Sequence, residues 1–206
     1  MINYERMMNE KLYQFDDELL KIGLNARRLL DIYNTTPHKE FEKRRQILKE
    51  LFSSVGDGAN VQAPFYCDYG VRISMGKNSF VNWNCTFLDQ GGITIGDNVL
   101  IGPNVGLYTP VHPIDPDVRK TGLELGKPIV IKENVWIGGS VIVNPGVTIG
   151  ENSIIGSGSL VTKDIPANVI AFGQPCRVIK KISDSDREYW KELQNDYEND
   201  LKKDNM

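Results

Sequence analysis

The chain has 206 residues, of which 25% are charged, and a formal net charge of −3 at pH 7. This length is sufficient for one domain with a sizeable core and short appendages. The slightly negative charge argues against a nucleic-acid-binding protein, which normally carries a strongly basic surface. No stretch approaches the ~18 consecutive apolar residues that a membrane-spanning helix needs, so we expect no membrane partner.

The first residues and the cysteines indicate the compartment. The segment Met1–Arg6 lacks the apolar run of a secretory signal peptide. Cys67, Cys85 and Cys176 are odd in number and widely spaced, which is typical of buried thiols in a reducing compartment. We therefore expect a cytoplasmic protein, and a catalytic cysteine is the less favoured alternative.

Residues 1–55 have the pattern of a helical cap. Spacings of three and four predict one helix whose apolar face contains Met8, Leu12, Phe15, Leu19 and Ile22. A second short helix is predicted over Ala26–Tyr33. Thr36 then predicts an N-cap, followed by Pro37 at the first position of a third helix.

Residues 56–180 contain a six-residue repeat. Its aliphatic positions share one phase in two runs: Ile95, Ile101 and Leu107, then Ile131, Ile137, Val143, Ile149, Ile155 and Val161. A period of six fits neither an amphipathic helix nor a simple alternating strand. It predicts a parallel β-helix, in which one side chain in six fills a narrow interior. Short strands in a β-sandwich are the alternative, which nine in-phase positions disfavour.

The repeat is interrupted at two places. Phe87 is followed by Ile95 after eight residues instead of six, which predicts a small bulge around Gln90–Gly92. Between Leu107 and Ile131 the repeat is absent, which predicts a long excursion from the coils. Loops held by a rigid scaffold often carry binding and catalytic residues, so we expect the functional residues there.

Residues 181–206 form a charged tail, with Ser183 or Asp184 as the expected helix cap. Residues four apart make an apolar stripe on this helix: Tyr189, Leu193, Tyr197 and Leu201. We expect this stripe to dock on the body or on a neighbouring copy.

The chain has two histidines, His38 and His112. His38 lies at the start of a charged helix and is expected at the surface. His112 lies in the excursion, where nearby prolines stiffen the loop. An imidazole, whose ordinary pKa is about 6.5, is suited to general-base catalysis near neutrality, and a structural loop histidine is the alternative. A zinc-dependent carbonic anhydrase would need about three histidine ligands, which disfavours a metal site.

Several longer motifs accompany His112. They are Cys67–Gly70, Asn82–Cys85, Ile95–Asn98, His112–Pro116, Leu125–Pro128, Asn134–Gly139, Asn144–Gly150, Val161–Pro166 and Gly173–Arg177. In these motifs the chain resembles the maltose and galactoside O-acetyltransferases, a subfamily of the hexapeptide-repeat acyltransferases. The resemblance extends from about Tyr4 to Lys181.

The resemblance implies a mainly β fold: a left-handed parallel β-helix with an N-terminal helical cap, over residues 1–55 and 56–180, followed by a C-terminal helix. The left hand is an exception to the usual right-handed crossover of parallel strands. The resemblance also implies a homotrimer with its active sites between subunits. The implied cosubstrate is acetyl-CoA, no metal is required, and the acceptor is a hydroxyl group of a sugar.

The resemblance also implies roles for individual residues. His112 would deprotonate the acceptor, Asn82 would orient it, and the backbone N–H of Gly139 would stabilise the oxyanion. The implied coenzyme A contacts are Trp136, Gly139, Ser157, Thr162, Lys163, Arg177 and Lys180. The cationic residues among them suit phosphates, although ordinary solvated lysines are the alternative.

The implied acceptor contacts are Asp17, Asp68, Asn82 and Gln90, with Asp16 as the alternative to Asp17. Gln90 stands where the galactoside branch has an acidic residue, while the neighbouring Asp89 is retained. The Cys67–Gly70 and His112–Pro116 motifs favour the maltose branch. We therefore expect an acetyl-CoA-dependent sugar O-acetyltransferase. The alternatives are a serine or antibiotic acceptor and a non-catalytic scaffold, which the His112 loop disfavours.

Overall fold

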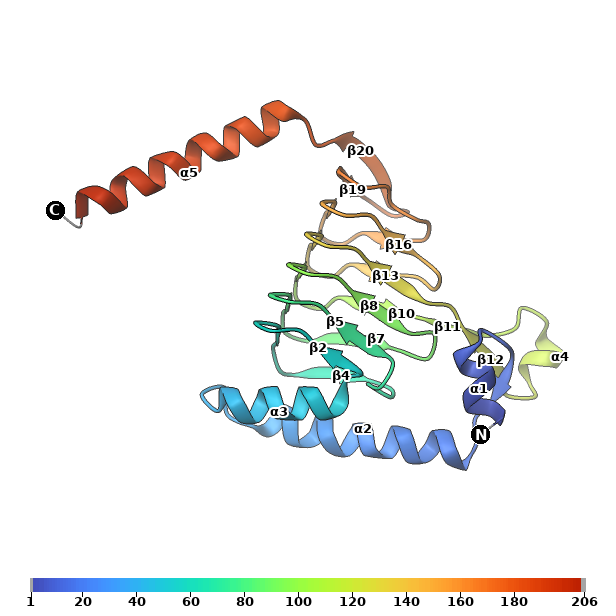
Figure 1. Ribbon diagram of the computed structural model, residues 1–206. Coiled ribbons are helices and arrows are strands. Elements are labelled where there is room, and N and C mark those ends of the chain that lie inside the picture. The colour runs from blue at the N-terminus through green and yellow to red at the C-terminus, as the bar shows by residue number, and fades with distance from the viewer. Residues whose placement is uncertain (1, 205–206) are drawn as a thin grey trace.

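The computed structural model describes residues 2–204, and its body is a left-handed parallel β-helix built from three sheets (Figure 1). The first sheet contains β2 (Ser54–Val55), β5 (Ile73–Met75), β8 (Ile93–Ile95), β13 (Ile129–Ile131) and β16 (Thr148–Ile149). The second contains β3 (Asn60–Val61), β6 (Phe80–Val81), β9 (Leu100–Ile101), β14 (Trp136–Ile137), β17 (Ile154–Ile155), β19 (Val169–Phe172) and β20 (Arg177–Lys181). The third contains β4 (Phe65–Cys67), β7 (Cys85–Leu88), β10 (Gly106–Tyr108), β15 (Ile142–Val143) and β18 (Leu160–Val161).

The hexad positions fill the interior of the coils, as the six-residue period predicts. Ile101 is in register with Ile137 on the next strand, and Ile137 is in register with Ile155. All nine aliphatic positions of the repeat are at most 2% exposed. Each coil therefore buries its aliphatic side chains against those of the coils above and below it, which stabilises the stack.

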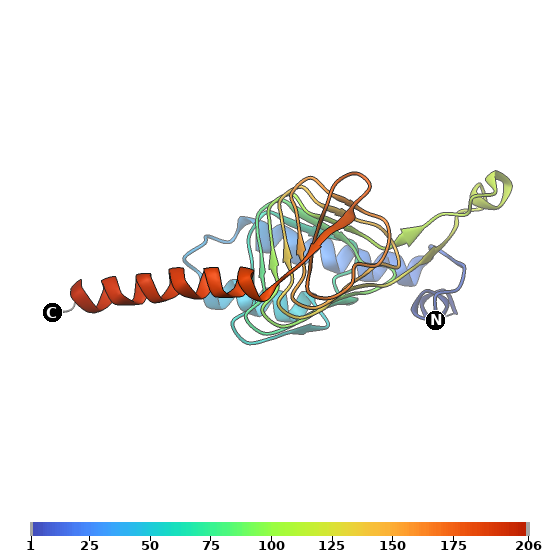
Figure 2. The ribbon, with the colours of Figure 1, turned by 90° about the horizontal axis from the view of Figure 1, so that it is seen from above.

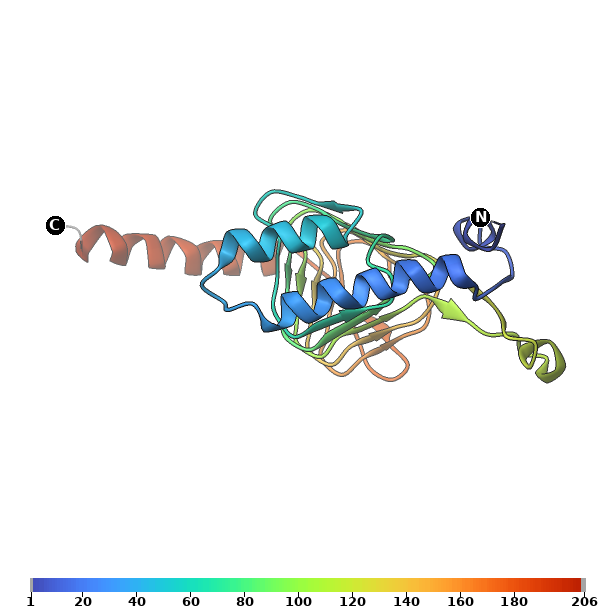
Figure 3. The ribbon, with the colours of Figure 1, turned by 90° about the horizontal axis from the view of Figure 1, so that it is seen from below.

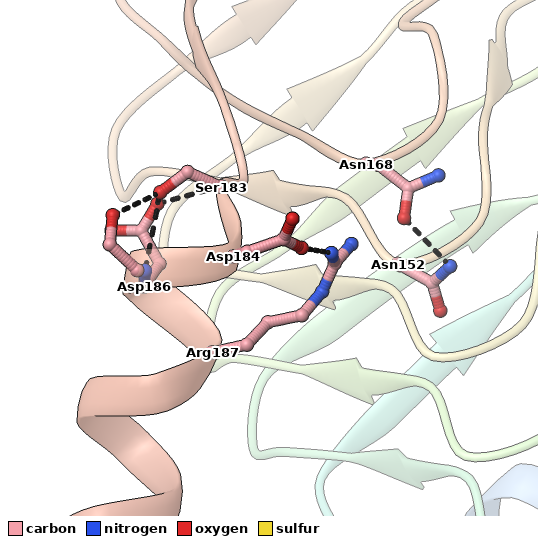
Figure 4. Close-up of polar contacts among 7 residues, drawn as sticks. Asn152, Asn168, Ser183, Asp184, Asp186 and Arg187 are labelled. Carbon is pink, nitrogen blue, oxygen red and sulfur yellow. Dashed lines mark hydrogen bonds and ion pairs between the residues drawn. The ribbon is translucent and has the colours of Figure 1, made fainter.

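One corner of the coils is built from stacked asparagines. Asn78, Asn98, Asn134, Asn152 and Asn168 all have φ between 54° and 59°. Asparagine tolerates this left-handed conformation better than most residues. The amide of each side chain donates to the side-chain oxygen of the next, at 2.9–3.3 Å. The last of these bonds, from Asn152 to Asn168, is drawn in Figure 4.

The N-terminal end of the coils is covered by α2 (Asp17–Thr35) and α3 (Phe41–Leu51), as Figure 3 shows. The predicted single helix through Met8 and Ile22 is wrong. The chain instead forms α1 (Ile2–Met8), then β1 (Tyr13–Gln14), and then α2. Asp16 starts α2 because its carboxylate accepts the backbone N–H groups of Glu18 and Leu19. The predicted second helix lies inside α2.

Thr36 ends a helix and does not begin one. Its backbone N–H and its hydroxyl both donate to the carbonyl of Ile32, in the last turn of α2. The predicted N-cap at Thr36 is therefore wrong. A residue before proline is disfavoured in the helical conformation, so α2 ends here, and the residue that precedes α3 is Glu40. Pro37 lies in a turn that is closed by a bond from the N–H of Glu40 to its carbonyl, and α3 follows at Phe41.

The C-terminal end carries β20, which is antiparallel to β19, and then α5 (Asp184–Asp204). Of the two predicted caps, Ser183 is the residue that caps α5. Its hydroxyl accepts the N–H of Asp186 and its own N–H donates to the Asp186 carboxylate (Figure 4). Residues 1, 205 and 206, which belong to the expected cap and tail, lie outside the described residues.

The helix α5 projects away from the coils (Figures 1 and 2). Its predicted apolar stripe is exposed: Tyr189, Leu193, Tyr197 and Leu201 are 43–63% accessible to solvent. The stripe therefore does not dock on the body of its own chain. Docking on a neighbouring copy stays a prediction.

The three cysteines are free and buried, as expected. Burial raises the pKa of the thiols of Cys67, Cys85 and Cys176. Raised thiol pKa values disfavour the reactive thiolate. Within residues 2–204, no helix combines the length and the apolar character needed to cross a bilayer.

Candidate functional site

The break in the hexad repeat forms an excursion that leaves the coils on the side opposite α5 (Figures 1 and 2). It contains β11 (Pro110–Val111), α4 (Pro116–Arg119) and β12 (Leu123–Gly126). Strands β11 and β12 pair antiparallel, and β1 from the N-terminal segment pairs with the other edge of β12. The excursion is therefore a small three-stranded sheet that combines two distant parts of the chain.

His112 follows β11 directly and faces Glu124 on β12. Its Nε2 atom lies 3.7 Å from Oε2 of Glu124. The imidazole is 62% exposed, whereas the Glu124 side chain is only 17% exposed. The hydroxyl of Tyr13 donates to the other carboxylate oxygen, Oε1, at 2.7 Å. His112 is thus an accessible imidazole beside a carboxylate that is itself held by a buried phenol.

A pocket of about 120 Å³ lies at the base of the excursion. Its lining consists of Phe15, Gly23, Arg27, Asp68, Tyr69, Gln90 and Glu124. The amide of Gln90 donates to Oδ2 of Asp68 at 2.7 Å, so two of the predicted acceptor contacts are side by side. The pocket and His112 share Glu124 as a neighbour.

Burial raises the pKa of Asp68, and the negative charge of Glu124 raises it further. Directly beneath lies Asp89, which is fully buried and whose pKa is raised to about 6, mainly by burial. Its carboxylate accepts the backbone N–H groups of Asp68 and Tyr69 at 3.0 and 2.9 Å. Asp89 therefore holds the backbone that presents Asp68 and does not itself face the pocket.

The alternatives Asp16 and Asp17 differ in their surroundings. The carboxylate of Asp16 caps α2 and also accepts the side-chain amide of Asn3. Asp17 is exposed in the first turn of α2. Asp16 thus has a structural function, while the Asp17 carboxylate faces solvent. Neither of them lines the pocket at the base of the excursion.

Asn82 and Gly139 lie at the corner that follows the second sheet. Asn82 comes after β6, is half-buried, and accepts the N–H of Trp83 at 2.8 Å through its side-chain oxygen. Gly139 follows β14 and is also half-buried. Within residues 2–204, neither belongs to the pocket beside His112. The structure of one chain therefore leaves these two predicted residues on a separate face.

The predicted coenzyme residues lie toward the C-terminal coils. Trp136 is 52% exposed on the outer side of β14. Ser157, Thr162 and Lys163 are exposed at corners of the following coils. Two of the predicted residues lie on β20: Arg177, which is exposed, and Lys180, whose ammonium contacts Asp186 of α5 at 2.6 Å.

Family models and known proteins match most of the chain. The maltose acetyltransferase hexapeptide capping motif matches residues 6–56. A hexapeptide repeat of succinyl-transferase matches residues 72–109, and the bacterial transferase hexapeptide with six repeats matches residues 128–163. The galactoside O-acetyltransferase of Escherichia coli K12 is 50% identical over 187 residues, which cover 90% of this chain and 92% of the relative. That of Lactococcus lactis is 46% identical, with coverages of 89% and 90%.

Solved structures of related acetyltransferases also match most of the chain. A maltose O-acetyltransferase from Clostridium difficile 630 has a TM-score of 0.88 and 50% identity, over 89% of this chain and 99% of that one. A galactoside acetyltransferase in complex with coenzyme A has a TM-score of 0.87 and 47% identity, with coverages of 91% and 94%. The chain belongs to the maltose and galactoside O-acetyltransferase family. It is an acetyltransferase, and the capping motif includes the end of α1 and all of α2 and α3.

Three residues of this candidate site are absent from the sequence-based prediction. Glu124 and Tyr13 contact one another across β12 and β1, and Arg27 lines the pocket from α2. A signal for Glu124 exists in the chain, because it lies within the excursion, immediately before the Leu125–Pro128 motif. Tyr13 carries no such signal, since its contact joins residues 111 positions apart.

Proposed function

We propose that the protein transfers the acetyl group of acetyl-CoA to a hydroxyl group of a sugar, with His112 as the general base. The observation that carries the proposal is the accessible His112 imidazole beside Glu124, above a pocket with Asp68 and Gln90. The relatives named for galactoside and maltose acetylation support the same acceptor class. The complex of one relative with coenzyme A supports the donor.

The reaction needs one proton to be moved twice. His112 takes the proton of the acceptor hydroxyl while the oxygen attacks the thioester carbonyl and forms the new C–O bond. The backbone N–H of Gly139 stabilises the oxyanion of the tetrahedral intermediate, a donor worth about 3–4 kcal/mol in comparable sites. The C–S bond then breaks, and the imidazolium returns the proton to the departing thiolate. General-base catalysis of this kind contributes about 10²–10⁴-fold.

The acceptor binds through Asp68 and Gln90, with Asn82 and Asp17 as further contacts. Carboxylate and amide groups are good partners for sugar hydroxyls, because a carboxylate can accept several hydrogen bonds and an amide can both accept and donate them. The bond from Gln90 to Asp68 orders both side chains before the sugar arrives, which reduces the entropy lost on binding.

Coenzyme A binds along the later coils. Lys163, Arg177 and Lys180 contact its phosphates through charge-assisted hydrogen bonds. Trp136 covers the pantetheine arm with its indole, and Gly139, Ser157 and Thr162 contact the same arm. The exposure of Trp136 supports this role, because an indole that is half accessible has a free face for a ligand.

The active protein is a cytoplasmic homotrimer whose sites lie between subunits. The separation of Asn82 and Gly139 from the pocket beside His112 supports this proposal, since a second copy is needed to complete the site. Sedimentation of the purified protein is expected to give a trimer. A fully active monomer would contradict the shared site.

The test of the function is a measurement of free thiol release from acetyl-CoA with a panel of acceptors. The panel contains maltose, glucose, a thiogalactoside, chloramphenicol and serine. Turnover is expected with a sugar, and His112→Ala is expected to lower kcat by at least about 10²-fold without unfolding the protein. Turnover with serine or chloramphenicol alone would establish the alternative acceptor class. Near-normal turnover of His112→Ala would exclude His112 as the base.

A further inference from the structure

We propose that Tyr13 and Glu124 are positioning residues that select the orientation and the tautomer of the His112 imidazole, so that the N-terminal cap takes part in the reaction through β1. The inference rests on the proposed role of His112 as the general base. It assigns a function to two residues that lie on different parts of the chain, outside the motifs shared with the family.

The three side chains lie in one row across the small sheet. Tyr13 is directly opposite Glu124 in the β1–β12 pair. In the β11–β12 pair, Pro110 is opposite Gly126 and Val111 is opposite Leu125. The next position in this register brings His112 opposite Glu124. Directly opposite residues of antiparallel strands have Cβ atoms about 4.5–5.5 Å apart on the same face, so the backbone alone directs Tyr13, Glu124 and His112 toward one another.

The Tyr13 hydroxyl holds one end of the Glu124 carboxylate. Tyr13 is fully buried and packs in a small core with Met7, Leu19 and Tyr69. Burial, together with the bond to Glu124, raises the pKa of Tyr13 above its ordinary value, so the phenol stays protonated and donates to Oε1. Because Oε1 is occupied, Oε2 is the oxygen that faces His112.

The free oxygen of Glu124 determines which ring nitrogen carries the proton. A carboxylate accepts hydrogen bonds and cannot donate them, so it favours the tautomer whose N–H faces it. The opposite nitrogen then keeps its lone pair for the acceptor hydroxyl. The distance of 3.7 Å is long for a hydrogen bond, and such contacts commonly shorten when substrate is bound or when the ring becomes positive.

Other charged and titratable groups face Glu124 as well. The Asp68 carboxylate interacts with it unfavourably, and Arg27 on α2 offsets the negative charge of Asp68. Tyr69 also lines the shared pocket. In this acidic environment the hydrogen bond from Tyr13 fixes one oxygen of Glu124, which leaves the other oxygen beside His112.

The first test compares Glu124→Gln and Tyr13→Phe with Gln14→Ala. Gln14 is the other residue of β1, and its side chain donates to the carbonyl of Thr121 in the excursion, so the control disturbs the same pairing outside the row. Glu124→Gln is expected to lower kcat by about 10–100-fold, because the amide can accept from a ring N–H through its oxygen or donate to an unprotonated ring nitrogen through its NH2 group, and so no longer selects one tautomer. Tyr13→Phe is expected to lower kcat by about 2–10-fold, the effect of one hydrogen bond. The KM for acetyl-CoA should stay the same, and Gln14→Ala should match the wild type.

The second test does not depend on turnover. The ¹⁵N chemical shifts of the His112 ring report its tautomer, and His38 is the other histidine of the chain and serves as an internal reference. A single tautomer is expected in the wild type and a mixture in Glu124→Gln. If no acceptor is acetylated but this difference is observed, the proposed function fails and the positioning role stands.

Three results would overturn the inference. One is an unchanged kcat for Glu124→Gln in a protein that acetylates its acceptor. Another is a further loss when Glu124→Gln is added to His112→Ala, because a residue that acts through His112 has nothing to act on in that background. The third is a loss shared equally by Gln14→Ala, which would show that the pairing of β1 is structural only.

Discussion

The coils and the excursion of this acetyltransferase are specified in two different ways. In the coils, each aliphatic residue contacts a residue of the same type in the next coil, as in the row of Ile101, Ile137 and Ile155. In the excursion, His112 faces Glu124 of β12, and Glu124 accepts a hydrogen bond from Tyr13 of the N-terminal segment. The coils repeat one kind of aliphatic contact, whereas the excursion combines single residues from separate parts of the chain.

This difference separates stability from chemistry. An interior aliphatic residue of the coils can be replaced without removing any group of the proposed site, provided that the stack remains folded. A residue of the excursion can be replaced with little effect on the buried core, because the small sheet projects from the body (Figure 2). We therefore expect variants of the coil interior to change the free energy of unfolding and variants of the excursion to change kcat.

The largest effect on stability is expected within the coils. Ile95 on β8 is 2% exposed, and Ile95→Ala should lower the free energy of unfolding by about 2–5 kcal/mol, from lost burial and the cavity that remains. Thr94→Ala on the same strand, whose side chain points outward, should change it by no more than about 0.5 kcal/mol. Urea unfolding measures both. Equal losses for the two variants would contradict the interior position of the hexad residue.

An intermediate effect, on the KM for acetyl-CoA, is expected for residues of the coils that are proposed to bind coenzyme A. Lys163→Ala and Arg177→Ala should each raise the KM for acetyl-CoA by about 10–150-fold, since a charge-assisted contact to phosphate is worth about 1.5–3 kcal/mol. Turnover at saturating donor should be unchanged, and Lys132→Ala, at an exposed corner, is the matched control. The loss should disappear with an acetylated pantetheine that lacks the nucleotide. A loss that persists with this donor would show an effect on folding or on chemistry.

The smallest effect is expected at Asp89, near the point where the coils and the excursion meet, and it concerns how the free energy of unfolding depends on pH. Its pKa in the folded protein is raised to about 6 from an ordinary value of 3.8, so the folded state binds the proton more tightly than the unfolded state. The stability that protonation contributes is complete below pH ~4 and is lost as the pH rises through ~6. Urea unfolding between pH 4 and 7 should show this decline in the wild type and less of it in Asp89→Asn. Parallel profiles would show that Asp89 does not titrate in this range.

The fold was predictable where the pattern is local. The hexads from Ile95 to Val161 indicate both the period and the buried side of every coil, because each position is determined by the same neighbours. The helical boundaries were less predictable. Thr36 has the composition of an N-cap, but it ends α2 by donating to Ile32, and Asp16 begins that helix where an apolar pattern predicted continuity.

The candidate site was predictable only in part, for a related reason. His112, Asp68 and Gln90 lie in motifs, so the sequence points to them, and the structure brings Asp68 and Gln90 together. Glu124 and Tyr13 follow from the register of two antiparallel pairs, and no spacing in the chain indicates that register. Arg27 reaches the pocket because α2 crosses the end of the coils, which is a property of the whole fold.

The covered ends of the coil stack determine how long the molecule can be. In-register strands stacked along one axis have the geometry of a cross-β fibre, and an open last coil would accept the first coil of another molecule. Helices α2 and α3 block one end (Figure 3), and β20 reverses direction at the other. The exposed Arg177, Lys180 and Lys181 of β20 add like charges that repel a second copy of the same edge. Each coil contacts only its neighbours, so the repeat itself sets no limit on the number of coils. The helical cap at one end and β20 at the other set this limit.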